Sequence, residues 1–381
     1  MQIETMCHTT AGGWSPGQFP ALDSESTLVT VFGGSERLDD VSELKRLLEA
    51  YPRAHTIGCS TSGEIYGTTI NDHSLSVAVC KFQGTRLRST AAPVRMAGDS
   101  REAGRRLGED LLAPDLRGIF VVSDGLRVNG SELLRGLNEV LSPAVVVTGG
   151  LAGDGDRFQR TWVIAGHQPS EGFVSAVGFY GERVRIGHGS KGGWDIFGPE
   201  RIVTRSSGNV LHEIDGKPAL ALYKDYLGNR AAGLPGTALL FPLSLRANRQ
   251  DQKTLVRTIL SVDDAGQTMT FAGDIPEGSI VQLMRANFDR LIEGASQAAR
   301  LTTATTGAEL AGESLTIAIS CVGRRLVLGQ RTEEEVEAAK DALPAGARLT
   351  GFYSYGEISP YATGRCDLHN QTMTLTNIQE T

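Results

Sequence analysis

GCSTSGEI (residues 58–65) and GFYSYGEI (residues 351–358) are nearly alike, although almost the whole chain separates them. Each stretch ends an expected strand and follows an expected helix. Each also places glycine, hydroxyl groups and a carboxylate in one short turn. The similarity predicts a duplicated unit whose two turns face one another or share a ligand.

The segments around these turns share one order of expected elements: strand, polar loop, amphipathic helix, strand, glycine-rich turn and strand. Three segments follow it, at residues 27–82, 118–180 and 314–378. Residues 201–299 are less regular, with a hairpin of 256–262 and 269–272 and a helix ending near 299. Since short turns precede the final strands, these strands should be antiparallel to their neighbours.

We therefore predict an α/β (mixed α+β) fold. It has two related domains built from repeated β-α-β-β units, with mixed, partly antiparallel sheets. The expected divisions are an N-terminal extension at 1–26, a first domain at 27–205 and a second domain at 206–381. Capping patterns support three of the helix starts, at Asp40 with Glu43, at Asn129, and at Thr332 with Glu335.

The composition narrows the class of protein. A chain of 381 residues suggests two domains, and 40% hydrophobic residues suffice for a core. The net charge is -7 and no dense block of Lys or Arg occurs, which disfavours nucleic acid and anionic membranes. The five cysteines form no C-x-x-C pair, so a reducing compartment is expected. Without a signal peptide or a long apolar run, we expect a cytoplasmic protein with no membrane insertion.

Two motifs point weakly to familiar sites. Residues 187–192 match G-x-G-x-x-G, but the following residues do not begin a helix, so a glycine-rich loop is favoured over a dinucleotide site. Residues 58–62 resemble the G-x-S-x-G turn of hydrolases, except that Ser62 replaces the last glycine. A nucleophile at Cys59, Ser60 or Ser62, helped by Asp154 or His369, remains an alternative to hydroxyl groups that only cap the turn.

Glu64 and Glu357 occupy matching positions and leave two interpretations open. Each carboxylate could bind a ligand ammonium, or it could accept backbone N–H bonds inside its own turn. The tyrosines Tyr353, Tyr355 and Tyr361 could line a pocket or fill space between layers. The candidate ligand contacts are Cys59, Ser60, Thr61, Ser62, Glu64, Ser123, Asp124, Asp154, Tyr353, Tyr355 and Glu357.

At these residues the chain resembles the FIST family of bacterial sensory domains, over nearly all of residues 28–376. The resemblance rests on residues 57–67 (IGCSTSGEIYG), 123–130 (SDGLRVNG), 149–158 (GGLAGDGDRF), 209–228, 271–278 (FAGDIPEG), 352–360 (FYSYGEISP) and 368–376 (LHNQTMTLT). It implies a small-molecule sensor in signal transduction, without catalysis, for ligands such as amino acids.

The resemblance also implies a haem alternative. A subset of the family is similar to nitric-oxide-sensing proteins, which bind haem b and regulate partner enzymes. Those partners are histidine kinases of two-component signalling, or a diguanylate cyclase or phosphodiesterase. No kinase or GGDEF segment is evident, so any partner is expected in trans, and a homodimer is compatible with the sequence. One axial histidine suffices for haem; His369, in the best-matching segment, is the first candidate and His188 the second.

Overall fold

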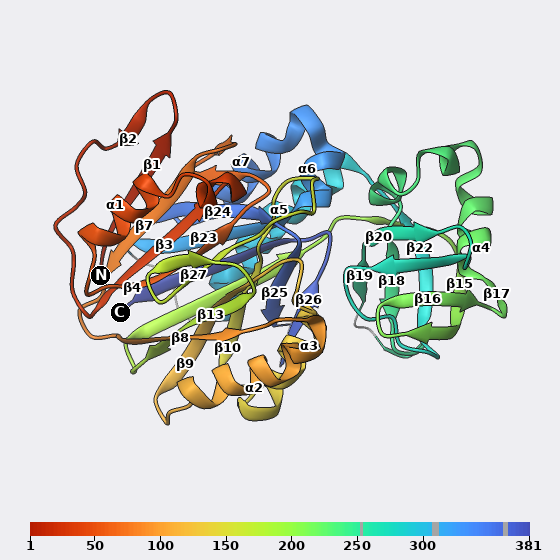
Figure 1. Cartoon of the computed structure of the whole chain (residues 1–381), viewed down its shortest axis with the longest axis horizontal. Helices are drawn as coiled ribbons and strands as arrows, with labels where there is room; N and C mark the ends of the chain where they lie inside the picture. The colour runs from red at the N-terminus through yellow and green to blue at the C-terminus, as the bar shows by residue number, and fades with distance from the viewer. Residues whose placement is uncertain (252–253, 307–311, 361–364) are drawn as a thin grey trace.

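The computed structural model describes residues 1–251, 254–306, 312–360 and 365–381 (Figure 1). Three sheets make up the body of the molecule. A separate β-rich lobe, green to cyan in the figure, lies at one end of it. The N- and C-termini lie close together at the opposite end.

All three sheets of the body have the same strand order, which reveals three copies of one unit. The first sheet consists of β12 (Gln168–Ser170), β11 (Val163–Ala165), β4 (His55–Ser60), β3 (Thr27–Gly33), β7 (Leu75–Lys81), β1 (Gln2–Thr9) and β2 (Gly13–Ser15). The second consists of β26 (Cys366–His369), β25 (Gly356–Pro360), β10 (Val146–Leu151), β9 (Leu116–Ser123), β13 (Phe173–Tyr180) and β8 (Arg86–Pro93). The third consists of β6 (Thr69–Asn71), β5 (Glu64–Tyr66), β24 (Ala347–Ser354), β23 (Ser314–Cys321), β27 (Met373–Glu380) and β14 (Val184–Lys191).

Each unit contains one parallel pair, β3/β4, β9/β10 or β23/β24, flanked by an antiparallel strand. The mixed α/β fold with repeated units is therefore confirmed. The helices of the body are α1 (Ser42–Ala50), α2 (Ser100–Leu111), α3 (Gly130–Val140), α5 (Phe288–Thr306), α6 (Val322–Leu328) and α7 (Thr332–Ala342). Short 3-10 turns are η1 (Ser35–Leu38), η2 (Ala97–Asp99) and η5 (Gly329–Arg331). No helix in these described ranges is long and apolar enough to cross a membrane.

The units exchange strands in a closed cycle. The hairpin β5–β6 of the first unit pairs with β24 of the third, and β25–β26 of the third pairs with β10 of the second. The hairpin β11–β12 of the second unit then pairs with β4 of the first. As a result, each sheet is completed by a neighbouring unit, and no unit holds a complete sheet of its own.

The lobe is inserted into the third unit, between β14 and α5. Its strands are β15 (Asp195–Ser207), β16 (Val210–Ile214), β17 (Lys217–Pro218), β18 (Leu243–Arg246), β19 (Leu255–Arg257), β20 (Ile259–Asp263), β21 (Thr268–Phe271) and β22 (Ile280–Arg285). Its helical segments are α4 (Ala219–Leu227), η3 (Gly228–Gly233) and η4 (Gly236–Leu240). The division expected between residues 205 and 206 lies inside β15, and residues 1–26 contribute β1 and β2 to the first sheet.

The central core lies where the three sheets face one another. Phe32 of β3, Phe120 of β9 and Phe352 of β24 are all fully or nearly fully buried in one cluster. Phe32 and Phe352 stack with ring centroids 4.6 Å apart. Burying one such ring contributes about 2–3 kcal/mol, so each unit supplies apolar surface that the others need.

All of the G-x-G-x-x-G stretch except Gly192 belongs to strand β14, so the expectation of a glycine-rich loop was wrong. Gly187 and Gly189 lie in β14 against α5. A Cβ atom on either glycine would lie 2.0 Å from a helix carbonyl oxygen, that of Thr302 or Ala298. The glycines therefore let a helix pack directly on the strand backbone.

Of the capping patterns, only one is confirmed. The side chain of Asn129 accepts a hydrogen bond from the backbone N–H of Glu132 at 3.2 Å. The α7 helix instead starts without a side-chain cap, because Glu335 is buried and pairs with Arg324 at 2.7 Å. The α1 helix also lacks a side-chain cap hydrogen bond.

Three equivalent glycines make the parallel pairs possible. A Cβ atom at Gly351 would lie 1.8 Å from the carbonyl oxygen of Ala318, and Gly58 and Gly149 face the same obstacle. We expect Gly351→Ala to lower the free energy of unfolding by about 2–3 kcal/mol, because β23 and β24 must separate. Chemical denaturation measures the change. Gly98→Ala is the control, because a Cβ atom there meets nothing within 4 Å; equal stabilities for the two variants would contradict this account.

Candidate functional site

Three strand-end turns meet at the centre of the body and bond to one another in a ring. They are residues 60–64, 151–155 and 353–357, which follow β4, β10 and β24; we call them the turn ring. Ser62 N donates to Tyr353 O at 2.7 Å, Tyr355 N to Leu151 O at 3.2 Å, and Gly153 N to Ser60 O at 2.9 Å. The prediction that the two matched turns face one another is confirmed, and the turn of the second unit completes the ring.

The two matched glutamates brace their own turns in the same way. Glu64 accepts hydrogen bonds from the hydroxyl of Thr61 and from both the backbone N–H and the hydroxyl of Ser74, the latter two at 2.8 Å. Glu357 accepts the equivalent bonds from Ser354 at 2.9 Å and from Thr372 at 3.2 and 2.9 Å. Since Ser74 and Thr372 immediately precede β7 and β27, each carboxylate ties its turn to the start of the closing strand.

Neither glutamate forms an ion pair within the described parts of the chain. Burial raises the pKa of Glu64 to about 7 and that of Glu357 to about 8, although the surrounding hydroxyl and N–H donors oppose the shift. These bonds favour the interpretation in which the glutamates hold the fold. Glu64 also reaches the wall of the cleft described below.

In the second unit, a different residue holds the start of the closing strand. Gly155 occupies the position of the glutamate, and Asp124, at the end of β9, provides the carboxylate. Asp124 accepts the backbone N–H of Gly172, the residue before β13, at 2.9 Å, and those of Leu126 and Arg127 at 2.8 Å. All three units therefore anchor the residue before the closing strand to a buried carboxylate.

Asp154 and Tyr355 join the second and third turns. The Tyr355 hydroxyl donates to Asp154, which also accepts the backbone N–H groups of Phe158, Gln159 and Arg160, each at 2.9 Å. The rings of Tyr355 and Phe158 stack at 4.5 Å. This contact fixes the loop after β10 beside the turn ring.

A cleft of about 570 Å³ opens beside the turn ring, and we call it the ring cleft. All three units contribute to its walls. The first provides residues 34, 36, 61–64, 70, 72 and 73, the second residues 155–157, and the third residues 322, 325, 326, 329, 330, 332 and 333. Its position outside the carboxyl ends of parallel strands is the usual ligand position in such sheets.

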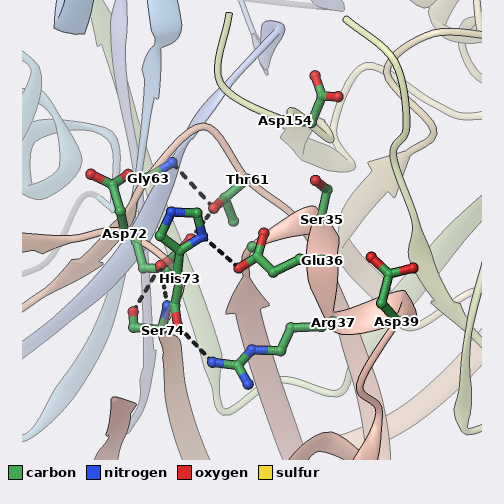
Figure 2. A network of polar contacts seen from close by, with 12 residues as sticks. Ser35, Glu36, Arg37, Asp39, Thr61, Gly63, Asp72, His73, Ser74 and Asp154 are labelled. Carbon is green, nitrogen blue, oxygen red and sulfur yellow. Dashed lines mark hydrogen bonds and ion pairs between the residues drawn. The ribbon is translucent and has the colours of Figure 1, made fainter. Parts of the chain in front are cut away.

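The ring cleft carries more acidic than basic groups. Its carboxylates belong to Glu36, Glu64, Asp72, Asp156 and Glu333, against the arginines Arg157 and Arg325. Figure 2 shows the Glu36 and His73 side chains pointing toward one another, with Glu36 Oε1 2.9 Å from His73 Nδ1. The excess of acids favours a ligand that carries positive charge.

Arg325 links the first and third units across the cleft. Its two terminal nitrogens each donate to Asp72 at 2.7 Å, and Nη1 also donates to Ser62 O at 2.6 Å. This bidentate contact lowers the pKa of Asp72. A Cβ atom at Gly63, whose φ is 129°, would lie 2.4 Å from Nη1, so glycine is required beneath the guanidinium.

The other candidate residues of the first turn stabilise the fold. Cys59 is fully buried in the central core, and burial raises the pKa of its thiol well above the usual range. The hydroxyl of Ser60 accepts the backbone N–H of Trp162 at 3.0 Å, and that of Ser62 accepts the N–H of Gly155 at 3.0 Å. Thr61 and Ser62 line the ring cleft, whereas Cys59 and Ser60 do not.

Candidates from the other turns are placed less favourably for a ligand. Tyr353 does not line the cleft itself: its hydroxyl donates to the buried Glu335 at 2.8 Å, and the guanidinium of Arg325 lies over its ring at 5.7 Å. Ser123 is buried beneath the ring, where its carbonyl accepts the N–H of Ala152 at 2.8 Å. Tyr361 lies outside the described residues.

The two histidine candidates share a different cavity of about 320 Å³, which Lys191, Thr305 and Thr372 also line. His369 Nε2 lies 3.1 Å from the carbonyl oxygen of Ser359, and burial lowers the pKa of His188. The described lining mixes polar side chains with the apolar Val256, Leu301 and Pro360, so its composition neither favours nor disfavours haem. No group of three or more His, Cys, Asp or Glu side chains in the described ranges could hold a metal ion.

Sequence reasoning missed the residues that shape the ring cleft most: Glu36, Asp72, His73, Arg157 and Arg325. One signal was present, because two adjacent arginines, Arg324 and Arg325, come shortly after an apolar strand, and charges close to a buried strand need partners. Arg324 finds Glu335 in a fully buried ion pair, and Arg325 turns to the cleft.

Comparison with known proteins identifies the family of the chain. A family model described as the FIST N domain matches residues 27–217, and one described as the FIST C domain matches residues 219–360. A solved structure of cyanuric acid hydrolase from A. caulinodans is similar at 8% identity and a TM-score of 0.39, covering 100% of this chain and 98% of that one. A likeness at that level carries no argument about fold or chemistry. No curated protein matches the chain in sequence.

The buried carboxyl of Glu357 makes stability depend on pH. Because its folded pKa is raised to about 8, the folded chain keeps a proton that the unfolded chain loses above its ordinary pKa. Its contribution is therefore fully present at acidic pH and is lost as pH rises toward about 8. We expect Glu357→Gln, which cannot ionise, to gain on the order of 5 kcal/mol relative to wild type between about pH 4.5 and pH 9.

Denaturant unfolding at a series of pH values measures this difference. Glu49→Gln is the control, because that side chain is 67% exposed on α1. Stability curves for wild type and Glu357→Gln that stay parallel across the pH range would show that the carboxyl is ionised in the folded chain.

Proposed function

The chain belongs to the FIST family, whose domains serve sensory signalling, and from this premise we propose that it is a non-catalytic sensor of a small polar metabolite. The ligand occupies the ring cleft. The output is the regulation, in trans, of a histidine kinase or of a diguanylate cyclase or phosphodiesterase.

The observation that carries the proposal is that all three units wall the ring cleft. Asp72, Arg157 and Arg325 come from the first, second and third unit respectively. A ligand that contacts all three units stabilises the relative positions of the units that it fits best. It shifts the equilibrium between two such conformations by the difference in its affinity for them. Strand exchange then carries any change in one unit into the next sheet.

The charges favour a ligand with an ammonium group. Glu333, in the first turn of α7, and Asp156, of the second unit, both line the cleft and are both exposed. Arg157 offers one cationic contact, with its side chain 44% exposed. A small zwitterion such as an amino acid can place its ammonium group near the carboxylates and its carboxylate near Arg157.

Two alternatives have less support. Haem with His188 or His369 as axial ligand requires a cavity of only about 320 Å³ to accept a large, flat group. A hydrolase using Ser60, Ser62 or Cys59 requires groups that are buried or already hydrogen bonded. Within the described ranges, the hydroxyls of Ser60 and Ser62 bond to the backbone of Trp162 and Gly155 and to no histidine.

The first test is binding of free amino acids and amines, measured by calorimetry after mass spectrometry of small molecules that co-purify. We expect Glu333→Gln to weaken binding of the best ligand about fivefold, because it removes one rim charge. The matched control is Glu337→Gln, one turn further along α7 and outside the cleft. If both variants lose affinity equally, or if neither loses affinity, then the ligand does not bind in the ring cleft.

The second test separates metabolite from haem. We expect protein supplied with haem to show no Soret band that shifts with nitric oxide. If such a band forms and His188→Ala or His369→Ala abolishes it, then haem is the ligand and the metabolite proposal is wrong.

A further inference from the structure

A second cleft, of about 530 Å³, separates the lobe from the body, and we call it the lobe cleft. One wall is the face of α3 with Ser131, Arg135 and Asn138. The opposite wall belongs to the lobe, and the exchanged strand β26 forms the back. This cleft shares no lining residue with the ring cleft.

Arg257, at the end of β19, is the central charged group of the lobe cleft. It is only 5% exposed, yet it lines the cavity. Its Nε donates to Asp274 O at 3.1 Å, and its Nη1 donates to the carbonyls of Leu368 at 3.1 Å and Val256 at 3.3 Å. All of these acceptors are neutral backbone groups.

The guanidinium therefore lacks a partner of opposite charge in direct contact. Within the described ranges, Arg257 forms no ion pair, and Nη2 takes part in none of its hydrogen bonds. Burial lowers its pKa to about 10, while Asp367 and Asp274 oppose the shift only as longer-range charges. Buried cations in proteins are normally paired, so this one favours an anion supplied from outside the chain.

The side chain of Arg257 packs against the FAGDIPEG stretch, residues 271–278. A Cβ atom at Gly273 would lie 3.1 Å from both Cζ and Nε of Arg257, so glycine lets the planar guanidinium lie against the backbone. The next residue, Asp274, accepts a hydrogen bond from Asn129 Nδ2 at 3.3 Å and lies 3.7 Å from Arg135. The same segment thus orients the arginine and fastens the lobe to the start of α3.

The surrounding charges narrow the ligand class. Glu139, Asp251, Asp274 and Asp367 line the cleft together with Arg135, Arg257 and Arg365. Four acids disfavour a phosphate or another polyanion, whereas a single carboxylate matches one guanidinium fork. We propose that the lobe cleft binds a small carboxylate-bearing molecule through Arg257, bridging the lobe and α3.

The probe for this site is trifluoroacetate, followed by the broadening of its fluorine NMR signal as protein is added. Trifluoroethanol has the same CF₃ group without the charge and serves as the matched probe. We expect saturable broadening with trifluoroacetate alone. Arg257→Met should weaken binding at least tenfold, Arg257→Lys should weaken it less, and Arg106→Met, on the exposed face of α2, should leave it unchanged.

Folding does not confound the test, because Met preserves the apolar stem of a buried arginine, and thermal unfolding verifies each variant. Should Arg257→Met fail to fold, Arg257→Lys decides alone. Undiminished binding in the folded Arg257 variant, or equal broadening by trifluoroethanol, overturns the proposal. Displacement by phosphate at equal concentration overturns the carboxylate class. Glu333→Gln should not change this fluorine signal. A negative result for the lobe cleft therefore does not contradict the proposed ligand site in the ring cleft.

Discussion

Three backbone hydrogen bonds at the centre of the body fix the course of the whole chain. Each bond joins the end of one parallel pair to the end of the next: 62 to 353, 355 to 151, and 153 to 60. A turn held in this way sends the following hairpin away from its own sheet and onto the neighbour's edge. The central aromatic cluster and the ring cleft both depend on this geometry, because they lie where the three units converge.

The buried ionisable groups of the molecule serve two different ends. Glu64, Asp124 and Glu357 accept backbone and hydroxyl donors, and each stabilises the start of a closing strand. Arg325 and Arg257 lie on the walls of cavities. Arg325 is paired across units, whereas the hydrogen bonds of Arg257 to the described residues all go to backbone carbonyl groups. The two cavities therefore differ in chemistry, one rich in exposed acids and the other built on a buried guanidinium.

The sequence predicted local structure well and long-range partners poorly. Apolar runs placed the strands of all three units, and Asn129 marked the start of α3. The turns at 58–65 and 351–358 could be recognised as equivalent because both contain Gly and Glu at the same spacing. The third turn escaped notice because Gly155 replaces the glutamate and its carboxylate, Asp124, comes from another strand. The pair of Arg325 with Asp72 was also hidden, since 253 residues separate them.

Strand exchange has a consequence for how this chain can be divided. The two family matches meet near residue 218, yet β25 of the C-terminal part completes the sheet built on β10, and β5 of the N-terminal part completes the sheet built on β24. Separation there would leave unpaired strand edges on both fragments, the kind of surface that leads to aggregation. The two family matches therefore do not mark two independent folding units: each half can be recognised by itself, but each needs strands of the other to complete its sheets.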